Sequence, residues 1–417
     1  MVGSSKTKPI IVIGAGICGV STALWLQNDG HHVILIDKSK PGGGASYGNA
    51  GLLAQSAVVP IATPALIRAA PLMLIDPNSA LFARWAYLPR MIPWLTKFLS
   101  NSRKMYADKI AQALPSLVTD AVEQHRALVR GTHIETWIKD SKLRYLYSSY
   151  RDYENDGYSW SLKCTAGFKP RIVTGPKIQQ LEPIVGPNIK CMVELDGQGH
   201  INNPGEYVAC LAHLFKSRGG RLITAEVKDF ERHDEKIAKV LTTNGSFECS
   251  KIVITSGIGS KILMNRLGLS VPLEAERGYH VLFKSPSILP NHPMMAAGKF
   301  GITPMGDVLR CAGTVELGDT ASGPSRAPIS FIRKFVNNAF PMLQYTGTEE
   351  WLGFRPSTPD SLPLIGQIGK SGIYTCFGHQ HIGLTAGPKS GRMITDLIAE
   401  RHFNFDITPY SPNRFSI

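Results

Sequence analysis

A glycine-rich turn between a strand and a helix restricts the possible folds of this chain more than any other feature. Residues 10–13 (IIVI) form a continuous β-branched run, which is typical of a buried parallel strand. Gly14, Gly16 and Gly19 follow in the pattern G-x-G-x-x-G, and a helix is expected over 20–27. The first glycine permits a tight turn, the second lets a pyrophosphate approach the backbone, and the third lets the helix pack on the strand. The sequence therefore predicts a dinucleotide-binding unit.

An acidic residue confirms the context of this motif. A second strand over 32–36 ends in Asp37, about 20 residues after the turn, where a carboxylate can accept hydrogen bonds from a ribose 2′-OH. A 2′-phosphate is disfavoured there. The start of the helix offers unpaired N–H groups to the pyrophosphate, so we expect contacts from Ile17 and Cys18, and from Lys38 beside the acid.

The charge of the chain is strongly positive. Its 417 residues include 45 Lys and Arg against 32 Asp and Glu, a formal net charge of +13. This excess fits nucleic acid, an anionic membrane surface, or only an anionic cofactor and substrate. The sequence has no long Lys/Arg run and no basic stripe interleaved with aromatic residues, so we expect no nucleic-acid partner. The length predicts two or three domains.

The cysteines and histidines do not predict a metal centre. The seven cysteines are scattered, without a C-x-x-C pair, so we expect a reducing compartment and a cytoplasmic location. Residues 378–392 (GHQHIGLTAGPKSGR) contain a His-x-His pair, but no third ligand at a sensible spacing accompanies it. We therefore predict no metal.

The chain leaves the dinucleotide-binding unit and returns to it. Residues 252–255 read as a second buried strand followed by a glycine turn, whereas 274–283 and 309–318 read as neighbouring antiparallel strands. The fold class is therefore α/β (α+β overall), with a Rossmann-like cofactor domain and a discontinuous substrate domain built on an antiparallel sheet. The expected boundaries are 1–56, 170–272 and 350–417 for the cofactor domain, and 57–169 and 273–349 for the substrate domain.

Residues 57–99 are rich in Pro, Leu, Ala and Trp. The prolines cut this segment into short pieces, and no stretch of about 18 uninterrupted apolar residues occurs in the chain. Two interpretations remain open. The short helices pack on the core, or amphipathic pieces carrying Arg68, Arg84 and Arg90 lie on an anionic membrane.

Arg277 and Tyr279 occupy alternate positions of a predicted strand and therefore share one of its faces. An arginine fork beside a tyrosine hydroxyl can hold a substrate carboxylate. The alternative is an ordinary salt bridge from Arg277 to Glu276 or Glu316, and the local sequence does not decide between the two.

Three stretches resemble a known family. Residues 38–51 (KSKPGGGASYGNAG), 351–366 (WLGFRPSTPDSLPLIG) and the glycine-rich stretch 378–392 are similar to motifs of the FAD-dependent D-amino acid oxidase/dehydrogenase family, which includes glycine and sarcosine oxidases. The likeness is closest to its D-amino acid dehydrogenases. It implies that the dinucleotide is FAD, that Ser46 contacts the pyrophosphate, and that Arg355 binds the substrate carboxylate.

The resemblance also assigns the remaining contacts. It implies that backbone N–H groups of residues 382–385 point at the flavin C2=O and that residues 379–381 line the flavin edge near the substrate. The expected substrate-binding residues are Arg355, Arg277, Tyr279, His379 and Gln380. The expected cofactor-binding residues are Gly14, Gly16, Ile17, Cys18, Asp37, Lys38, Ser46, Asn49, Ala50, Gly51, Leu52, Val227, Thr255, Gly257, His381, Ile382, Gly383, Leu384 and Thr385.

The reaction that the resemblance implies is oxidative deamination of D-α-amino acids to 2-oxo acids and ammonia, by hydride transfer from Cα to flavin N5. Oxidation of secondary amino acids such as D-proline, hydroxyproline, sarcosine or glycine is the alternative. Gly353 stands where sarcosine-oxidase relatives carry a flavin-linking cysteine, so non-covalent FAD is expected. A quinone or a respiratory chain is the expected electron acceptor, with peripheral association at the inner face of the cell membrane. The sequence does not distinguish an oxidase from a dehydrogenase.

Overall fold

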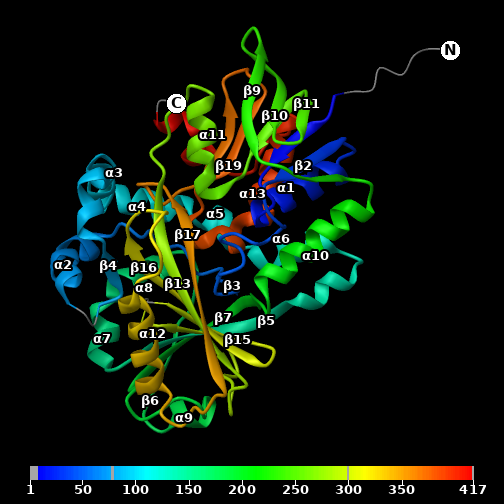
Figure 1. Cartoon of the computed structure of the whole chain (residues 1–417). Coiled ribbons are helices and arrows are strands. Elements are labelled where there is room, and N and C mark those ends of the chain that lie inside the picture. The colour runs from blue at the N-terminus through cyan, green and yellow to red at the C-terminus, as the bar shows by residue number, and fades with distance from the viewer. Residues whose placement is uncertain (1–7, 77–78, 298–299, 416–417) are drawn as a thin grey trace.

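The computed structural model describes residues 8–76, 79–297 and 300–415 and contains two large sheets, one above the other in Figure 1. The upper sheet has six strands in the order β18-β19-β12-β1-β2-β8. All neighbours in it are parallel except β18 and β19. The strands are β1 (Ile10–Ile13), β2 (Val33–Asp37), β8 (Arg221–Thr224), β12 (Lys251–Ile254), β18 (Leu364–Ile368) and β19 (Ile373–Phe377). The predicted return of the chain to lie beside the first strand is confirmed by the β1–β12 pairing.

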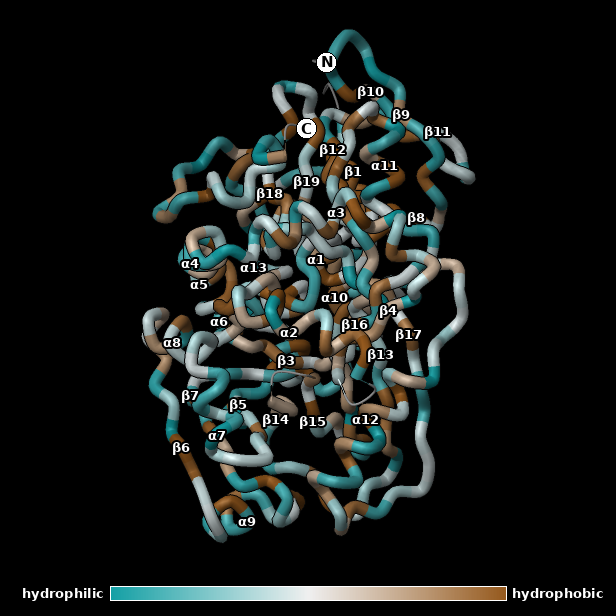
Figure 2. Tube along the Cα trace, turned by 90° about the vertical axis from the view of Figure 1, so that its left-hand side faces the viewer, coloured by the Kyte–Doolittle hydropathy of each residue, from teal (hydrophilic) through white to brown (hydrophobic). Residues whose placement is uncertain are grey.

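Both faces of the six-stranded sheet are covered, which explains the unbroken apolar run of its first strand. Ile10 and Val12 face one core with α1 (Ile17–Asn28), α10 (Pro204–Ser217) and α13 (Gly383–Ile398). The intervening Ile11 and Ile13 face a second core with α11 (Ser260–Arg266). A small antiparallel sheet also contributes to this second core: β9 (Val227–His233), β10 (Lys236–Thr242) and β11 (Gly245–Glu248). Figure 2 shows hydrophobic segments gathered around β1 and β12 and hydrophilic ones at the tip of the β9–β10 hairpin.

The lower sheet has ten strands and is mostly antiparallel, as the sequence predicts. Its main path runs β17-β13-β16-β15-β14-β5-β7-β3, with β4 beside β16 and β6 beside β7. Helix α12 (Arg326–Ala339) packs against one face. The strands are β3 (Leu52–Leu53), β4 (Leu81–Ala83), β5 (Ile138–Tyr147), β6 (Arg171–Thr174), β7 (Cys191–Ile201), β13 (Glu274–Lys284), β14 (Met294–Ala296), β15 (Gly301–Met305), β16 (Val308–Leu317) and β17 (Gly347–Ser357).

Four strands that lie wholly or mostly on the cofactor side of the expected boundaries pair in the lower sheet. They are β3, β6, β7 and β17. We propose that the substrate-binding part therefore includes residues 52–53, residues 170–201 and the strand from 347 to 357, because a strand belongs with the sheet that satisfies its backbone hydrogen bonds.

Short helices lie, along the chain, between successive strands of the lower sheet. They are α2 (Pro64–Ile75), α3 (Leu88–Asn101), α4 (Lys104–Ala113), α5 (Pro115–Val118), α6 (Ala121–Val129), α7 (Tyr150–Asn155), α8 (Gly157–Thr165) and α9 (Lys177–Leu181). Helix α3 buries Met91 and Trp94, whereas α2 buries none of its residues. Of the two interpretations given for residues 57–99, packing on the protein core therefore applies to α3 but not to α2. Within the described ranges, no helix has both the length and the hydropathy needed to cross a membrane.

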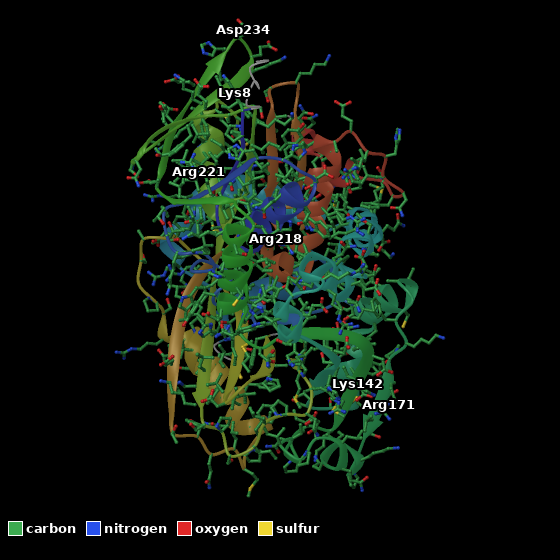
Figure 3. All side chains as sticks on the ribbon, turned by 90° about the vertical axis from the view of Figure 1, so that its right-hand side faces the viewer. Lys8, Lys142, Arg171, Arg218, Arg221 and Asp234 are labelled. Atoms are coloured by element: carbon green, nitrogen blue, oxygen red, sulfur yellow. The ribbon has the colours of Figure 1, made fainter. Side chains whose placement is uncertain are left out.

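The excess positive charge is dispersed over the molecule. Figure 3 shows Lys8 near the top, Arg218 and Arg221 at middle heights, and Lys142 with Arg171 near the lower end. The last two converge on Glu194, whose Oε1 accepts from Lys142 Nζ at 2.8 Å and from Arg171 Nη2 at 2.7 Å. Part of the surplus is thus neutralised locally rather than collected into one anion-binding face.

Candidate active site

The glycine turn after β1 is shaped by close backbone contacts. Gly14 has φ +112°, and a Cβ there would lie 2.8 Å from backbone atoms of Thr255 and Ser256. A Cβ on Gly19 would lie 1.8 Å from Gly14 O. Helix α1 begins directly after Gly16 without a side-chain cap. Because the first N–H groups of a helix have no intrahelical partner, this end presents donors to an anion.

Asp37 and Ser46 both reach the same turn. Asp37 Oδ2 accepts from Ala15 N at 2.6 Å, and its Oδ1 accepts from Ser39 N at 2.8 Å. Ser46 Oγ accepts from Ile17 N at 3.1 Å. These contacts place the predicted ribose acid and the predicted pyrophosphate contact at one helix start, while Lys38 remains exposed beside Asp37.

Thr255 closes the turn from β12. Its hydroxyl donates to Ile13 O and Gly14 O, both at 2.9 Å. Gly257, with φ +56°, begins the short helix η3 (Gly257–Gly259) that follows. The end of β12 therefore lies against the end of β1, where the sequence places both residues in the cofactor site.

A second helix start meets the segment 49–52. Thr385 Oγ1, in the first turn of α13, donates to Leu52 O at 3.1 Å, and α13 also lacks a side-chain cap. Asn49 Oδ1 accepts from Gly51 N at 2.8 Å and so folds the segment on itself. Helices α1 and α13 pack closely, since a Cβ on Gly387 would lie 2.9 Å from Ile17. The three predicted cofactor segments therefore lie together between the sheets.

Arg355 projects from β17 on the face of the lower sheet opposite α12. It lies directly opposite Glu276 of β13. Its guanidinium lies over Gly278, since a Cβ added to that glycine would be 2.7 Å from Arg355 Cζ. Among the described residues the guanidinium makes one hydrogen bond, from Nη1 to Thr314 O at 3.2 Å, and no ion pair. Burial lowers the pKa of Arg355, and the charge of Glu276 opposes that shift. The guanidinium thus retains donors for an anionic ligand.

Two buried polar atoms without a hydrogen-bond partner lie on the same sheet face as this arginine. They are Glu276 Oε2 and Ser357 Oγ. Buried polar groups are nearly always hydrogen-bonded in folded proteins, so a group of unpartnered ones beside a buried cation indicates a ligand site.

Comparison with known proteins decides the identity of the fold. Residues 9–397 match the family model DAO, described as FAD dependent oxidoreductase. The chain belongs to this family. It is 34% identical to a D-amino-acid oxidase of Bradyrhizobium diazoefficiens, over 98% of this chain and 99% of that protein. It is 25% identical to a D-amino acid dehydrogenase of Helicobacter pylori, over 94% of both.

The solved structures agree on the fold. The glycine oxidase of Geobacillus kaustophilus superposes with a TM-score of 0.73 at 21% identity, over 97% of each chain. The chain is thus an FAD-dependent oxidoreductase with a mixed α/β fold, which confirms the expected family, fold class and cofactor.

The residues of this DAO-family chain fit FAD. The glycine turn leaves no room for side chains at positions 14 and 19, Gly16 provides no cap for α1, whose Ile17 N is bound by Ser46 Oγ, and Asp37 stands at the end of β2. The uncapped start of α13 provides a second set of donors beside residues 49–52. Val227 is buried at the start of β9 and shares a core with Ile36, so an adenine contact from it stays a prediction.

Arg277 and Tyr279 lie on the opposite face of the sheet from Arg355. Arg277 Nε donates to Glu316 Oε2 at 2.5 Å, and its other nitrogens donate to the backbone carbonyls of Asp319, Ser322 and Gly323. Tyr279 donates to the same Glu316 oxygen at 2.5 Å. Of the two interpretations that the sequence left open, the structure therefore supports the salt bridge from Arg277 to Glu316. The remaining donors of Arg277 are bound to backbone carbonyl groups. We therefore withdraw both residues from the substrate site.

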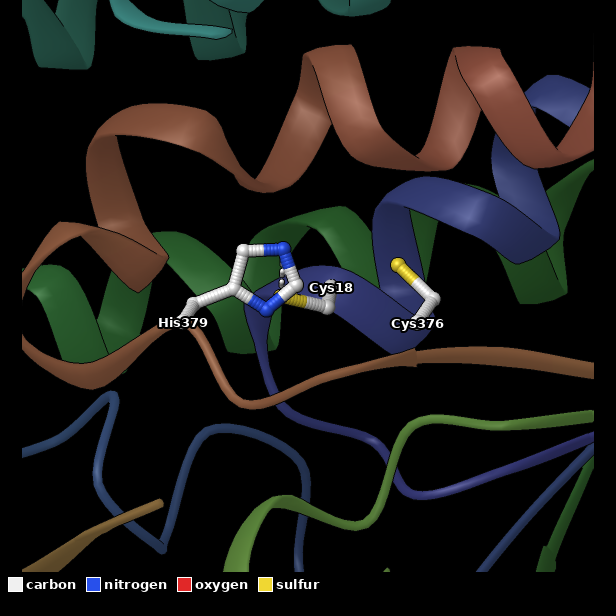
Figure 4. Close-up of side chains that lie close together, drawn as sticks. All are labelled: Cys18, Cys376 and His379. Carbon is white, nitrogen blue, oxygen red and sulfur yellow. Dashed lines mark hydrogen bonds between the residues drawn. The ribbon is translucent and has the colours of Figure 1, made fainter. Parts of the chain in front are cut away.

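The ring of His379 lies between α1 and α13. Its Nε2 lies 2.9 Å from Ser390 Oγ and its Nδ1 lies 3.5 Å from Cys18 Sγ, as Figure 4 shows for the cysteine. The ligand atoms of Cys18, Cys376 and His379 lie within 4.8 Å of one another. Sequence spacing could not reveal this cluster, because its members come from α1, β19 and the following loop.

Gln380 and His381 also differ from their predicted roles. Gln380 is buried and its Nε2 donates to Thr358 O at 2.7 Å, so it braces the turn after β17. His381 is accessible to solvent and lies close to Arg355. The surrounding protein and then the charge of Arg355 lower the pKa of His381 to about 4. We therefore assign His381, rather than His379 or Gln380, to the substrate side.

Sequence reasoning missed Arg310, and it named Glu276 only as a salt-bridge partner of Arg277. Arg310 Nη1 donates to Tyr47 O and Asn49 O, both at 2.9 Å, and its buried Nε has no partner. Burial lowers the pKa of Arg310 to about 10, and no carboxylate among the described residues acts on it. The positive charge of Arg310 thus supports the segment that the resemblance places beside the flavin. Only the charge of these two residues within predicted strands could have drawn attention to them.

Proposed function

We propose that this enzyme oxidises D-α-amino acids to 2-oxo acids and ammonia. The observation that carries the proposal is the buried guanidinium of Arg355, which has a single backbone acceptor in the protein and stands among unpartnered polar atoms. Such a group fits a planar carboxylate. The D-stereochemistry rests on the relatives, which are named D-amino-acid oxidase and D-amino acid dehydrogenase.

The role of the chain in this reaction is to bind and orient the substrate. FAD, when bound, accepts the hydride from the substrate Cα. Arg355 fixes the carboxylate through its planar fork, which restricts rotation of the substrate and holds Cα in one place. His381 is uncharged near neutral pH, because its pKa is lowered to about 4, and so adds no second positive charge beside Arg355.

The test is anaerobic bleaching of the bound flavin by amino acids of both hands, with D-proline, sarcosine and glycine in the same panel. We expect bleaching by primary D-amino acids and little by L-amino acids. Arg355→Lys keeps the charge but loses the bidentate fork, so KM should rise about ten- to hundredfold with the flavin content unchanged. Bleaching by L-amino acids alone, or by secondary amino acids alone, would contradict the proposal.

We also propose that the enzyme passes its electrons to a membrane quinone and rests on an anionic membrane through the segment from α2 to α3. Leu72, Ile75, Trp85 and Ile92 of this segment are 69%, 70%, 60% and 55% exposed. Such a concentration of exposed apolar side chains is typical of an interaction surface. Arg84 faces inward, since its Nη2 donates to Gly323 O at 2.8 Å, so it does not belong to this surface.

Basic residues accompany the apolar ones. Arg68, Arg90 and Lys97 are exposed in the same segment, as a surface for anionic lipid requires. Sedimentation with vesicles containing anionic lipid should carry the protein down, and Leu72→Ser with Ile75→Ser should abolish this. Ile262→Ser is the matched control, because Ile262 is 59% exposed elsewhere in the fold. Equal sedimentation of both variants would refute this surface.

A further inference from the structure

Glu276 is a buried acid, and the salt bridge to Arg277 that the sequence allowed for it is made by Glu316 instead. It lies on β13 directly opposite Arg355 of β17, so the two side chains share one face of the sheet. Only 3% of its surface is exposed, and its Oε2 has no hydrogen-bond partner.

Glu276 and Arg355 do not neutralise each other directly. Directly opposed residues have Cβ atoms about 5 Å apart, close enough for an ion pair. The guanidinium instead lies over Gly278, two residues further along β13, and no ion pair within 4.0 Å joins it to Glu276 among the described residues. Two opposite charges are thus held on one face without a direct ion pair.

Other carboxyl groups on nearby strands are fully engaged. Glu316 accepts from Arg277 and Tyr279, and Glu274, two residues before Glu276, accepts from Lys261 Nζ at 2.5 Å. Burial raises the pKa of Glu276, while the charge of Arg355 and the hydroxyl of Ser357 act in the opposite direction. An acid buried without an ion-pair partner is unfavourable unless a ligand supplies one.

We propose that Glu276 binds the α-ammonium group of the substrate while Arg355 binds its carboxylate. The inference rests on the proposed function, which it deepens by naming the group that recognises the amine. An α-amino acid carries its two opposite charges on neighbouring groups, and the site presents the complementary pair on one face. Glu276 thereby selects amino acids over 2-hydroxy acids and simple carboxylates, which would place a negative group beside it without a compensating cation.

The test compares ligands with and without an amine. Holoenzyme is titrated with D-alanine, scored by KM and by anaerobic flavin bleaching, and with D-lactate and benzoate, scored by the change in the flavin absorbance spectrum. In Glu276→Gln, binding of D-alanine should weaken about ten- to hundredfold, the usual effect of losing a hydrogen bond to a charged group. D-lactate and benzoate should bind as tightly or more tightly, because a negative charge near Arg355 is gone.

The opposite signs separate recognition from a structural role. A merely structural Glu276 would weaken both classes of ligand in the variant, and that result would overturn the proposal, as would unchanged D-alanine binding. Glu276→Asp should restore part of the preference for the amine. Glu274→Gln is the matched control and should leave the ratio of the two affinities unchanged.

The two proposals fail in different ways. If no amino acid bleaches the wild-type flavin, the proposed function fails. The ligand preference of Glu276→Gln is measured against a wild type on which D-alanine acts. If D-alanine bleaches the flavin of Glu276→Gln with an unchanged KM, the proposed function stands and the role of Glu276 is refuted.

Discussion

Replacing Glu316 by Gln tests whether the Arg277 cluster is structural. The carboxylate of Glu316 is buried and accepts from Arg277 Nε and from the Tyr279 hydroxyl, both at 2.5 Å. Gln keeps the shape but removes the negative charge, which leaves a buried guanidinium with only neutral acceptors. The variant should therefore be less stable but should bind substrate as the wild type does.

The magnitude follows from the surroundings of Arg277. Breaking a buried ion pair by removing one partner costs about 3–5 kcal/mol. The carbonyl groups of Asp319, Ser322 and Gly323 remain as acceptors, so the lower end of this range, about 3 kcal/mol, is expected. For a chain of this length that corresponds to a fall in Tm of about 3–6 °C.

The assay pairs thermal unfolding with KM for D-alanine. Glu350→Gln is the matched control, because Glu350 pairs with Arg333 at 2.7 Å on the surface, where such a pair contributes little. A rise in KM of tenfold or more with an unchanged Tm would refute the reasoning, since it would return the Arg277 cluster to the substrate site.

The same variant should change the dependence of stability on pH. Burial raises the pKa of Glu316, but hydrogen bonds from Ser325, Tyr279 and Arg277 outweigh burial and hold it below its usual value. A group with a lowered pKa in the folded state stabilises above its unfolded value, about 4.3, and this contribution is lost as pH falls through the folded pKa. The stability of Glu316→Gln should therefore fall less steeply than that of wild type below about pH 4.3.

Three further outcomes are expected. Acid precipitation should release the flavin into the supernatant, because Gly353 stands where a flavin-linking cysteine would be; flavin in the pellet would contradict this. Gly19→Ala should yield protein without FAD, measured by absorbance, because its Cβ would lie 1.8 Å from Gly14 O. His381→Gln should leave the shape of the kcat/KM profile unchanged between about pH 6 and 9, because the surrounding protein and then the charge of Arg355 lower the pKa of His381 to about 4; a lost inflection in that range would show that His381 titrates there.

The cofactor site could be predicted well because backbone geometry within a short stretch defines it. Gly14, Gly16 and Gly19 specify their turn by the absence of side chains, and Asp37 follows at the end of the next strand. The parallel run of β1 requires cover on both faces, so the fold class follows from the same residues. None of these inferences requires knowledge of which distant strands pair with β1.

The substrate site was harder to predict because the direction of each side chain depends on distant partners. The sequence showed that Arg277 and Tyr279 share a face, and they do, but only α12 and β16 reveal which face that is. Likewise, alternation along a strand would have put His379 and His381 on one side. Gln380, with φ +48°, begins the short helix η4 (Gln380–Ile382) between them, so one histidine is buried and the other is accessible.

The arrangement of β13 explains how one strand serves stability and specificity at once. Successive residues of a strand point to opposite faces, so Glu276 and Arg277 are neighbours in sequence but belong to different environments. The charge of Arg277 is balanced within the protein by Glu316. Arg277 also donates to the backbone of Asp319 and so ties the sheet to the segment that precedes α12. Glu276 and Arg355 keep their charges unsatisfied on the other face. A site that must bind a dipolar ligand has to retain such unpaired groups, and the fully paired network behind it holds the strand that carries them in place.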